Sequence, residues 1–117
     1  MEYIDLDVWK ESRKLVKYLY KITNSFPQAE LYGLTAQMRR SVVSIPSNIA
    51  EGCGRRTNAD TIQFLHISRG SLYELETQIY LALDQEYIND EECALLLKQI
   101  ETNKKLLNGF INYYKNK

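Results

Sequence analysis

The stretch from residue 40 to residue 56, RSVVSIPSNIAEGCGRR, constrains the fold more than any other part of this sequence. Val42, Ile45 and Ile49 recur at intervals of three and four residues, which is the period of an α-helix. Pro46 lies inside that pattern, although a proline in a helix interior removes one backbone hydrogen bond and costs about 3 kcal/mol. Either the helix ends near Ile45 or it continues with a kink. The apolar spacing continues in phase through Pro46, which favours the kink.

A line of small polar residues runs beside the apolar one, with a charge of opposite sign near each end: Gln37, Arg40, Ser44, Ser47 and Glu51. A second polar line follows later in the chain: Ser71, Glu74 and Gln78. If the helices that carry these lines are antiparallel, as their short connection requires, Arg40 lies within a turn of Glu74. We therefore expect a structural polar seam in which Arg40 and Glu74 form a charge pair. The alternative is a catalytic or ligand cleft.

Three glycines carry structural expectations. Gly52 and Gly54 follow the last apolar residue of the first pattern and should stop that helix, because glycine freely adopts the left-handed cap conformation. Gly70 lies in the middle of a predicted helix, where it costs about 1 kcal/mol relative to alanine. We therefore expect residues 68–71 to form a tight crossing with a neighbouring helix.

Two further amphipathic patterns, one at each end of the chain, complete the predicted fold. The N-terminal pattern stops at Pro27, because the residue before a proline avoids helical geometry. The expected N-caps are Asp5 or Asp7, then Thr57 or Asn58, then Asn89 or Asp90. The sequence therefore predicts an all-α protein in one domain over residues 1–117. It should be an antiparallel up-and-down four-helix bundle with helices at about 7–26, 34–53, 58–86 and 90–114.

Several segments resemble one protein family, and together they cover about residues 5 to 112. They are the early VWK, FP and ELYGL, then LTAQMRRS, SIPSNIAEG and RGSLYELET. The chain resembles the small four-helix-bundle proteins encoded by intervening sequences of bacterial large-subunit ribosomal RNA genes. The resemblance implies assembly into a ring, typically a pentamer. It also implies kinship with the accessory protein of a reverse transcriptase in diversity-generating elements, which binds nucleic acid.

The charge balance bears on nucleic-acid binding. Lys plus Arg and Asp plus Glu both number 15, so the net charge is zero, whereas dedicated duplex-DNA binders usually carry a basic excess. Local basic patches remain, either as solvated surface or as phosphate contacts. The candidates are Arg13, Lys14 and Lys17 on the first helix, with Arg39, Arg55 and Arg56. With the resemblance, they lead us to expect an RNA- or DNA-binding accessory protein. The alternative is a protein-binding scaffold or adaptor ring without nucleic-acid contact.

The sequence contains no recognisable catalytic or metal-binding motif. His66 is the only histidine, and neither a Glu-x-x-His pair nor a Cys/His cluster accompanies it. Cys53 and Cys93 are far apart and not in a CxxC arrangement, so we expect free thiols. We expect no enzymatic activity, no cofactor and no metal.

Location and assembly can also be predicted. No apolar run approaches the roughly 20 residues of a membrane span, and the acidic N-terminus does not resemble a signal peptide. We therefore expect a cytoplasmic protein that does not enter a membrane. The first, third and fourth helices carry apolar residues on more than one face, which indicates a homo-oligomer. The pentamer is the number that the resemblance implies.

Overall fold

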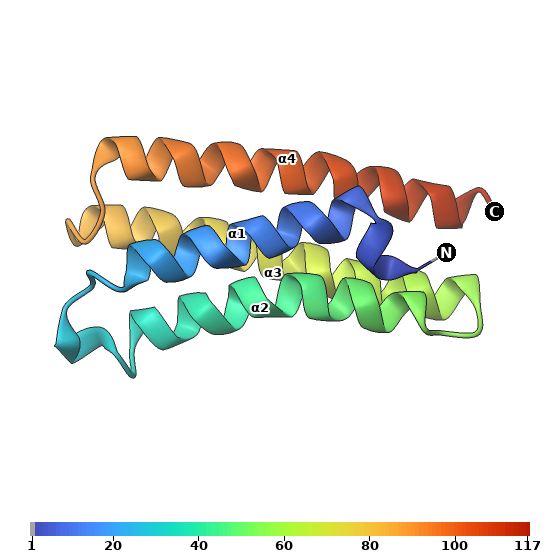
Figure 1. Ribbon diagram of the computed structural model, residues 1–117, viewed down its shortest axis with the longest axis horizontal. Helices are drawn as coiled ribbons and strands as arrows, with labels where there is room; N and C mark the ends of the chain where they lie inside the picture. The colour runs from blue at the N-terminus through green and yellow to red at the C-terminus, as the bar shows by residue number, and fades with distance from the viewer. Residues whose placement is uncertain (1) are drawn as a thin grey trace.

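Four α-helices lie side by side and run alternately in opposite directions in this computed structural model, which describes residues 2–117 (Figure 1). They are α1 (Asp7–Thr23), α2 (Leu34–Cys53), α3 (Asn58–Asp84) and α4 (Asp90–Lys115). Two short 3-10 helices, η1 (Tyr3–Asp5) and η2 (Gln28–Glu30), precede α1 and α2. The described residues contain no β-strand. The predicted all-α four-helix bundle is confirmed.

Each helix packs against two neighbours, so that α1, α2, α3 and α4 follow one another around the bundle, and the contact between α2 and α3 is the most extensive. Every helix contributes one apolar stripe to a single core, as an amphipathic helix should. The largest side chains of this core are completely buried: Leu15, Leu19, Met38, Ile45, Ile49, Leu65, Leu72, Leu75, Ile79, Leu96, Ile100 and Leu107. No helix in the described part of the chain combines the length and the hydropathy needed to cross a membrane.

Helix α2 has the predicted bounds and passes through Pro46 without interruption, so the alternative of an end near Ile45 is excluded. Side chains donate hydrogen bonds to the carbonyl groups just before the proline. Asn48 Nδ2 donates to the carbonyl oxygen of Ser44 at 2.8 Å, and Ser68 Oγ of α3 donates to the carbonyl oxygen of Ile45 at 2.9 Å. The predicted left-handed glycine cap is wrong, because Gly54 has a φ of −88° and no described glycine has a positive φ.

Helix α1 ends at Thr23 rather than at Phe26, so its predicted end was too late. Beyond Thr23 the chain turns more tightly: the amide of Phe26 donates to the carbonyl of Thr23 at 3.1 Å, three residues back. Pro27 has no amide proton with which to continue the α-helical ladder, so its effect reaches three residues upstream. The predicted N-cap at Asp5 or Asp7 is also wrong. Leu6 occupies the cap position without a side-chain bond, and Asp7 is the first helical residue.

Helix α3 ends at Asp84 rather than at residue 86 because the chain adopts a left-handed conformation at Glu86, where φ is 62°. The amides of Glu86 and Tyr87 donate to the carbonyls of Leu83 and Ala82, both at 2.9 Å. This is the Schellman arrangement, here with glutamate where glycine is usual. Helix α4 extends one residue beyond the prediction, to Lys115.

Two of the predicted N-caps are confirmed. Thr57 Oγ1 accepts from the Asp60 amide at 3.1 Å at the start of α3. At the start of α4, Asn89 Oδ1 accepts from the Glu92 amide at 2.7 Å, and Glu92 Oε1 accepts from the Asn89 amide at 3.0 Å. This reciprocal pair is a capping box, which satisfies two amides that the helix leaves free.

Candidate functional site

The solvent-facing side of α1 gathers basic side chains around one hollow. Its lining consists of Lys10, Arg13, Lys14 and Lys17 with Trp9, Ile4 and two carboxylates, Asp7 and Glu11, and its volume is about 670 Å³. All four basic residues are exposed. The spacing of three and four residues places them on one face, and at 1.5 Å per residue they cover about 10 Å of the helix axis. The predicted residues Arg13, Lys14 and Lys17 therefore lie together, and Lys10 joins them.

Aromatic residues border this basic face on the side of α2. The guanidinium of Arg13 lies over the Trp9 ring, 5.4 Å from its centre, and Tyr3 packs edge-on against the same indole at 5.4 Å. Trp9 and Arg13 also line a smaller notch of about 330 Å³ against Val43 and Pro46 of α2. Lys14 pairs with Glu11 at 3.1 Å, an exposed contact that contributes little to stability. The basic face and the aromatic notch thus share Trp9 and Arg13.

Arg39 lies elsewhere and has local partners. Its Nε donates to Thr23 Oγ1 at 2.9 Å, and its Nη2 donates to Asn24 Oδ1 at 3.0 Å. Its guanidinium also covers the Tyr20 ring at 4.6 Å. These contacts join α2 to the end of α1, so Arg39 serves the packing of the two helices.

Arg55 and Arg56 lie in the loop between α2 and α3, at the end of the bundle where the chain termini also lie (Figure 1). Arg55 covers the Phe64 ring at 4.3 Å and approaches Glu51 to 3.9 Å. Arg56 is exposed and makes no ion pair within residues 2–117. Of these two predicted residues, Arg56 is therefore the one whose guanidinium is available to a phosphate.

The polar line of α2 meets that of α3 at its centre. Ser71 Oγ donates to Ser44 Oγ at 2.9 Å, and Gln37, Arg40, Ser41 and Glu74 line the same polar hollow, whose volume is about 470 Å³. Arg40 and Glu74 are both exposed, and no ion pair joins them in the described structure. The expected charge pair is therefore not formed.

The ends of the two polar lines have different surroundings. Ser47 faces the notch between α1 and α2, and Glu51 pairs with Arg55. Gln78 is buried, and its Oε1 has no hydrogen-bond partner in the structure. The polar lines therefore meet over about one turn around Ser44 and Ser71 and do not form a continuous seam.

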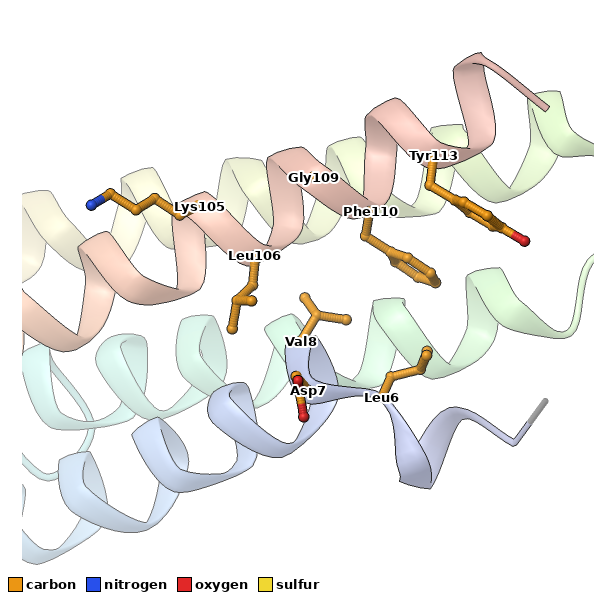
Figure 2. Close-up of a pocket in the computed structure, with 8 residues that line it drawn as sticks. All are labelled: Leu6, Asp7, Val8, Lys105, Leu106, Gly109, Phe110 and Tyr113. Atoms are coloured by element: carbon orange, nitrogen blue, oxygen red, sulfur yellow. The ribbon is translucent and has the colours of Figure 1, made fainter.

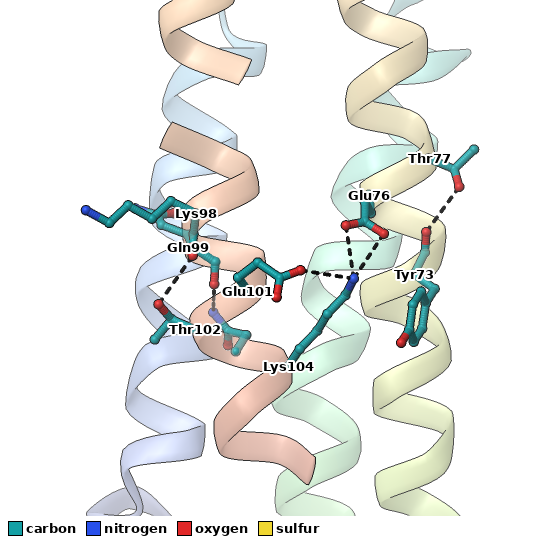
Figure 3. A network of polar contacts seen from close by, with 9 residues as sticks. Tyr73, Glu76, Thr77, Lys98, Gln99, Glu101, Thr102 and Lys104 are labelled. Carbon is teal, nitrogen blue, oxygen red and sulfur yellow. Dashed lines mark hydrogen bonds and ion pairs between the residues drawn. The ribbon is translucent and has the colours of Figure 1, made fainter. Parts of the chain in front are cut away.

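A polar network between α3 and α4 escaped the sequence analysis (Figure 3). Lys104 Nζ lies 3.0 Å from both carboxylate oxygens of Glu76 and 3.5 Å from Glu101, and it covers the Tyr73 ring at 4.3 Å. Burial by itself lowers the pKa of Lys104, but the hydrogen bonds and charges of Glu76 and Glu101 outweigh it and raise that pKa. One turn and more away, Arg69 donates to Asn108 at 3.0 Å. Antiparallel pairing of α3 and α4 about their short link could have indicated both contacts.

A largely apolar hollow of about 500 Å³ opens between the start of α1 and the last turns of α4. Figure 2 shows Leu6, just before α1, and Val8 of α1 facing Leu106 and Phe110 of α4 across it, with Tyr113 at one side. Lys105 points away from this space, so its lining offers few polar groups to a ligand.

The surroundings of the histidine and of the two cysteines shift their pKa values and reduce their reactivity. Burial, then the charges of Arg69 and Lys115, lower the pKa of His66, and Arg69 Nη2 lies 2.9 Å from His66 Nδ1. That nitrogen must therefore accept, which leaves the imidazole neutral. Burial raises the pKa of both Cys53 and Cys93, which are free thiols as predicted, and disfavours the reactive thiolate. Among the described residues, no three His, Cys, Asp or Glu side chains lie together as a metal site would require.

The chain matches both solved structures and a protein-family model. The chain is similar to a crystal structure of a protein with unknown function from the S23 ribosomal protein family of Bacteroides thetaiotaomicron. The two are 25% identical, and the match has a TM-score of 0.81 and covers 90% of this chain and 95% of the other. No curated protein matches. The model of the 23S rRNA-intervening sequence protein family matches residues 4–109, which is most of the chain and includes all four helices. The chain therefore belongs to the family of 23S rRNA-intervening sequence proteins.

Proposed function

We propose that this protein is a non-enzymatic, RNA-binding accessory protein of the cytoplasm, and that its contact surface is the exposed basic face of α1. The observation that carries the proposal is the grouping of Lys10, Arg13, Lys14 and Lys17 around one hollow beside Trp9. The family name links proteins of this kind to ribosomal RNA, which makes RNA the first nucleic acid to test.

The spacing of these charges suits a nucleic-acid backbone. Lys10, Lys14, Lys17 and Lys21 follow one another at four, three and four residues, which corresponds to steps of about 4.5 to 6 Å along the helix axis. Lysine side chains are long enough to adapt to phosphates that follow one another along a strand. The Arg13 guanidinium, which lies over the Trp9 ring, offers a plane on which an unpaired base can stack.

The distribution of charge explains how a chain of zero net charge can bind a polyanion. Five carboxylates lie within nine residues at the end of α3 and the start of α4: Asp84, Glu86, Asp90, Glu91 and Glu92. This link lies at the opposite end of the bundle from the loop that carries Arg55 and Arg56 (Figure 1). The acidic end repels phosphates, so RNA is directed to the α1 face and to the end with the termini.

The proposal is tested by binding of a structured RNA and of a DNA of equal length across a series of salt concentrations. If the protein contacts phosphates, the logarithm of the binding constant falls linearly with the logarithm of the salt concentration, with a slope of about −0.7 to −0.9 per phosphate contacted. Changing Lys10→Gln together with Lys17→Gln should reduce the slope by about 1.5 for each protomer engaged. Arg55→Glu with Arg56→Glu reports whether the loop contributes as well.

The matched control changes two exposed lysines of α4, Lys98→Gln with Lys105→Gln, which alters the net charge equally but leaves the α1 face intact. If both double variants weaken RNA binding to the same extent, only net charge matters and the α1 site is refuted. Absence of binding at about 50 mM salt, where such contacts are strongest, refutes the RNA-binding function itself.

We also propose that the protein acts as a homo-oligomeric ring, a pentamer by family resemblance. Large apolar side chains remain exposed on α3 and α4 in the single chain: Ile67, Tyr73, Tyr80, Leu81, Leu95 and Tyr113. Such surface is commonly covered by another subunit. A ring would repeat the basic face several times, so modest single sites would act together. Light scattering at micromolar protein should give a multiple of the 13.7 kDa chain, and a monomer mass would contradict this proposal.

The same exposed apolar side chains favour the second candidate function, a protein-binding scaffold without nucleic-acid contact. Tyr80, Leu81 and Leu95 are uncharged and well exposed, which suits a protein interface better than an RNA backbone. The salt series separates the candidates, because a scaffold gives no salt-dependent RNA binding. A pull-down from the native host with wild type and Leu81→Glu would then identify the apolar contact by its loss.

A further inference from the structure

The polar hollow between α2 and α3 has a composition unlike the other hollows of the molecule. Its lining consists of Gln37, Arg40, Ser41 and Ser44 from α2, and Ser71 and Glu74 from α3. No aromatic or aliphatic side chain lines it. Three serines occupy the positions between the charged residues, and because their side chains are short they leave a space of about 470 Å³ outside the core. That volume lies within the usual range of small-molecule sites.

The two charges of this hollow face the same space without meeting. Neither Arg40 nor Glu74 takes part in a hydrogen bond or an ion pair of the described residues, although α2 and α3 make the most extensive helix contact in the bundle. By contrast, Lys104 of α4 and Glu76 of α3 form an ion pair, with 3.0 Å between Lys104 Nζ and a carboxylate oxygen of Glu76. One cationic and one anionic group thus stand on opposite walls, each with its hydrogen-bonding capacity unused.

The hydroxyl groups on the floor of the hollow leave a directed donor. Ser44 Oγ accepts from Ser71 Oγ and from Asn48 Nδ2, both at 2.9 Å. A hydroxyl has two lone pairs and one proton, so Ser44 has used both acceptor positions and still has a proton to donate. Ser44 follows Arg40 by one helical turn on α2. The α2 wall therefore offers hydrogen-bond donors, and the carboxylate of Glu74 on the α3 wall offers acceptors.

We propose that this hollow is a binding site for a small polar zwitterion, of the class of free α-amino acids. Its carboxylate lies against Arg40 and the Ser44 hydroxyl, because a guanidinium matches a carboxylate in shape and charge. Its ammonium group lies against Glu74, which when ionised only accepts hydrogen bonds. Gln37 can serve either end with its amide. This site is separate from the basic face of α1, so it does not rest on RNA binding.

The charge arrangement excludes simpler ligands. An inorganic anion at Arg40 meets the nearby Glu74 carboxylate, and a cation at Glu74 meets the Arg40 guanidinium. A nucleobase finds no ring to stack on, and an apolar ligand finds no apolar wall. A zwitterion satisfies both charges together.

The test is isothermal titration calorimetry of the full chain with L-serine and L-glutamine in three matched forms. The free amino acid carries both charges, the N-acetyl form lacks the ammonium charge, and the C-terminal amide lacks the carboxylate. We expect at least one free amino acid to bind about tenfold more tightly than either of its derivatives, because each derivative leaves one charged group unpaired. Equal or absent binding of all three forms of both amino acids overturns the proposal.

Two variants locate the site. Arg40→Met and Glu74→Gln should each weaken binding of that free amino acid about tenfold or more, with the circular dichroism spectrum and oligomer mass of wild type. The matched control is Lys98→Met with Glu91→Gln, which removes one exposed basic and one exposed acidic side chain of α4 and should bind as wild type does. Unchanged binding in both site variants overturns the assignment. So does a loss of RNA affinity or of oligomer mass in Arg40→Met, because the hollow would then belong to another interface.

Discussion

Two helix contacts of the bundle differ in their hydrogen bonds: side-chain hydrogen bonds join α2 to α3, whereas none joins α1 to α4 in the described residues. Between α2 and α3, side-chain hydroxyls reach the backbone of the other helix: Ser68 Oγ donates to the Ile45 carbonyl at 2.9 Å and Thr61 Oγ1 to the Gly52 carbonyl at 2.8 Å. Between α1 and α4, within residues 2–117, no hydrogen bond crosses, and their ends enclose an apolar hollow of about 500 Å³.

The comparison shows that glycine has two different structural roles in this bundle. An added Cβ at Gly52 of α2 would lie 3.0 Å from Phe64 Cβ and 3.3 Å from the Thr61 carbonyl oxygen. An added Cβ at Gly109 of α4, beside the apolar hollow, meets nothing within 4 Å. The first glycine permits a close approach of two helices. The second leaves space and lowers helix propensity without a packing reason in the single chain.

The largest effect should come from Gly52→Ala. Phe64 Cβ and the Thr61 backbone cannot rotate away from the new methyl group, so α2 and α3 must separate locally. Overpacking of this kind destabilises by about 1–3 kcal/mol, and we expect about 2 kcal/mol from denaturant unfolding. Gly54→Ala is the control, because its added Cβ would have one ordinary contact, 3.6 Å from the Glu51 oxygen. Equal stability of the two variants would contradict a tight crossing at Gly52.

Removing one hydroxyl between α2 and α3 should have the next largest effect. Ser68→Ala deletes the buried hydrogen bond to the Ile45 carbonyl and should lower the free energy of unfolding by about 1 kcal/mol. Thr77→Ala is the control, because the Thr77 hydroxyl only bonds within its own exposed helix turn. Its effect should stay within about 0.5 kcal/mol. If Ser68→Ala behaves like Thr77→Ala, the hydroxyls do not stabilise this contact.

On the looser side, Gly109→Ala should stabilise by up to about 1 kcal/mol, which is the propensity difference in a helix interior. Gly70→Ala of α3 is the matched control, because its added Cβ also meets nothing within 4 Å. Melting temperatures of both variants should rise. A gain at Gly70 with a loss at Gly109 would show that another subunit covers this face of α4 in solution.

The sequence predicted the elements of the fold where local chemistry decides them. Thr57 and Asn89 cap their helices as their side chains allow, and the in-phase apolar residues carried α2 correctly through Pro46. Two helix ends were predicted too late, because the tight turn before Pro27 and the left-handed Glu86 depend on how each link closes. A tight crossing was predicted at residues 68–71, where Ser68 and Ser71 do contact α2. Gly70 itself faces no neighbour, and the glycine that a neighbour crowds is Gly52, since only the helix packing decides which glycine faces another helix.

The candidate site was less predictable for the same reason. Periodicity alone placed Arg13, Lys14 and Lys17 on one face, where they lie. It could not show that Arg39 is held by Thr23 and Asn24, because that contact depends on the path of the link between α1 and α2. Antiparallel register correctly predicted that the polar lines of α2 and α3 face each other, and Ser44 meets Ser71 there. It could not determine which charged side chains would form an ion pair.

Because α1 and α4 share no hydrogen bond in the described structure, the loops at the acidic end help to hold the looser side in place. Glu30, just before α2, accepts from the Leu34 amide at 3.0 Å and from the Tyr87 hydroxyl of the α3–α4 link at 2.8 Å. The Leu34 amide bond, then the Tyr87 bond, lower the pKa of Glu30.

A lowered folded-state pKa means that Glu30 stabilises the fold above its unfolded pKa of about 4.3 and loses this contribution as the pH falls through its folded pKa. Glu30→Gln should therefore be less stable than wild type at pH 7, by a small amount at this solvent-accessible site, and the difference should shrink below pH about 4. Urea unfolding between pH 7 and pH 3 measures it, with Asp84→Asn as a control that removes a carboxylate without hydrogen bonds. A gap that is constant with pH would contradict the role of the Glu30 charge.

The smallest effect concerns the polar hollow between α2 and α3. Had Arg40 and Glu74 formed a partly buried pair, Arg40→Met would strand a carboxylate at a cost on the order of 3 kcal/mol. In the structure both side chains are exposed and unpaired across the polar hollow, so neither has a partner to lose. Arg40→Met and Glu74→Gln should each change the free energy of unfolding by less than about 0.5 kcal/mol.

The positive control for that measurement is Lys104→Met, which breaks a half-buried pair that does form, with Glu76 at 3.0 Å, and should destabilise clearly. If Arg40→Met costs as much as Lys104→Met, the two charges meet in solution and the hollow is closed. If Arg40→Met is neutral in the free protein, the charges of the hollow are not maintained for stability. In that case the buried core and the hydrogen bonds of Thr61 and Ser68 stabilise the contact of α2 and α3, and Arg40 and Glu74 are free to bind a ligand.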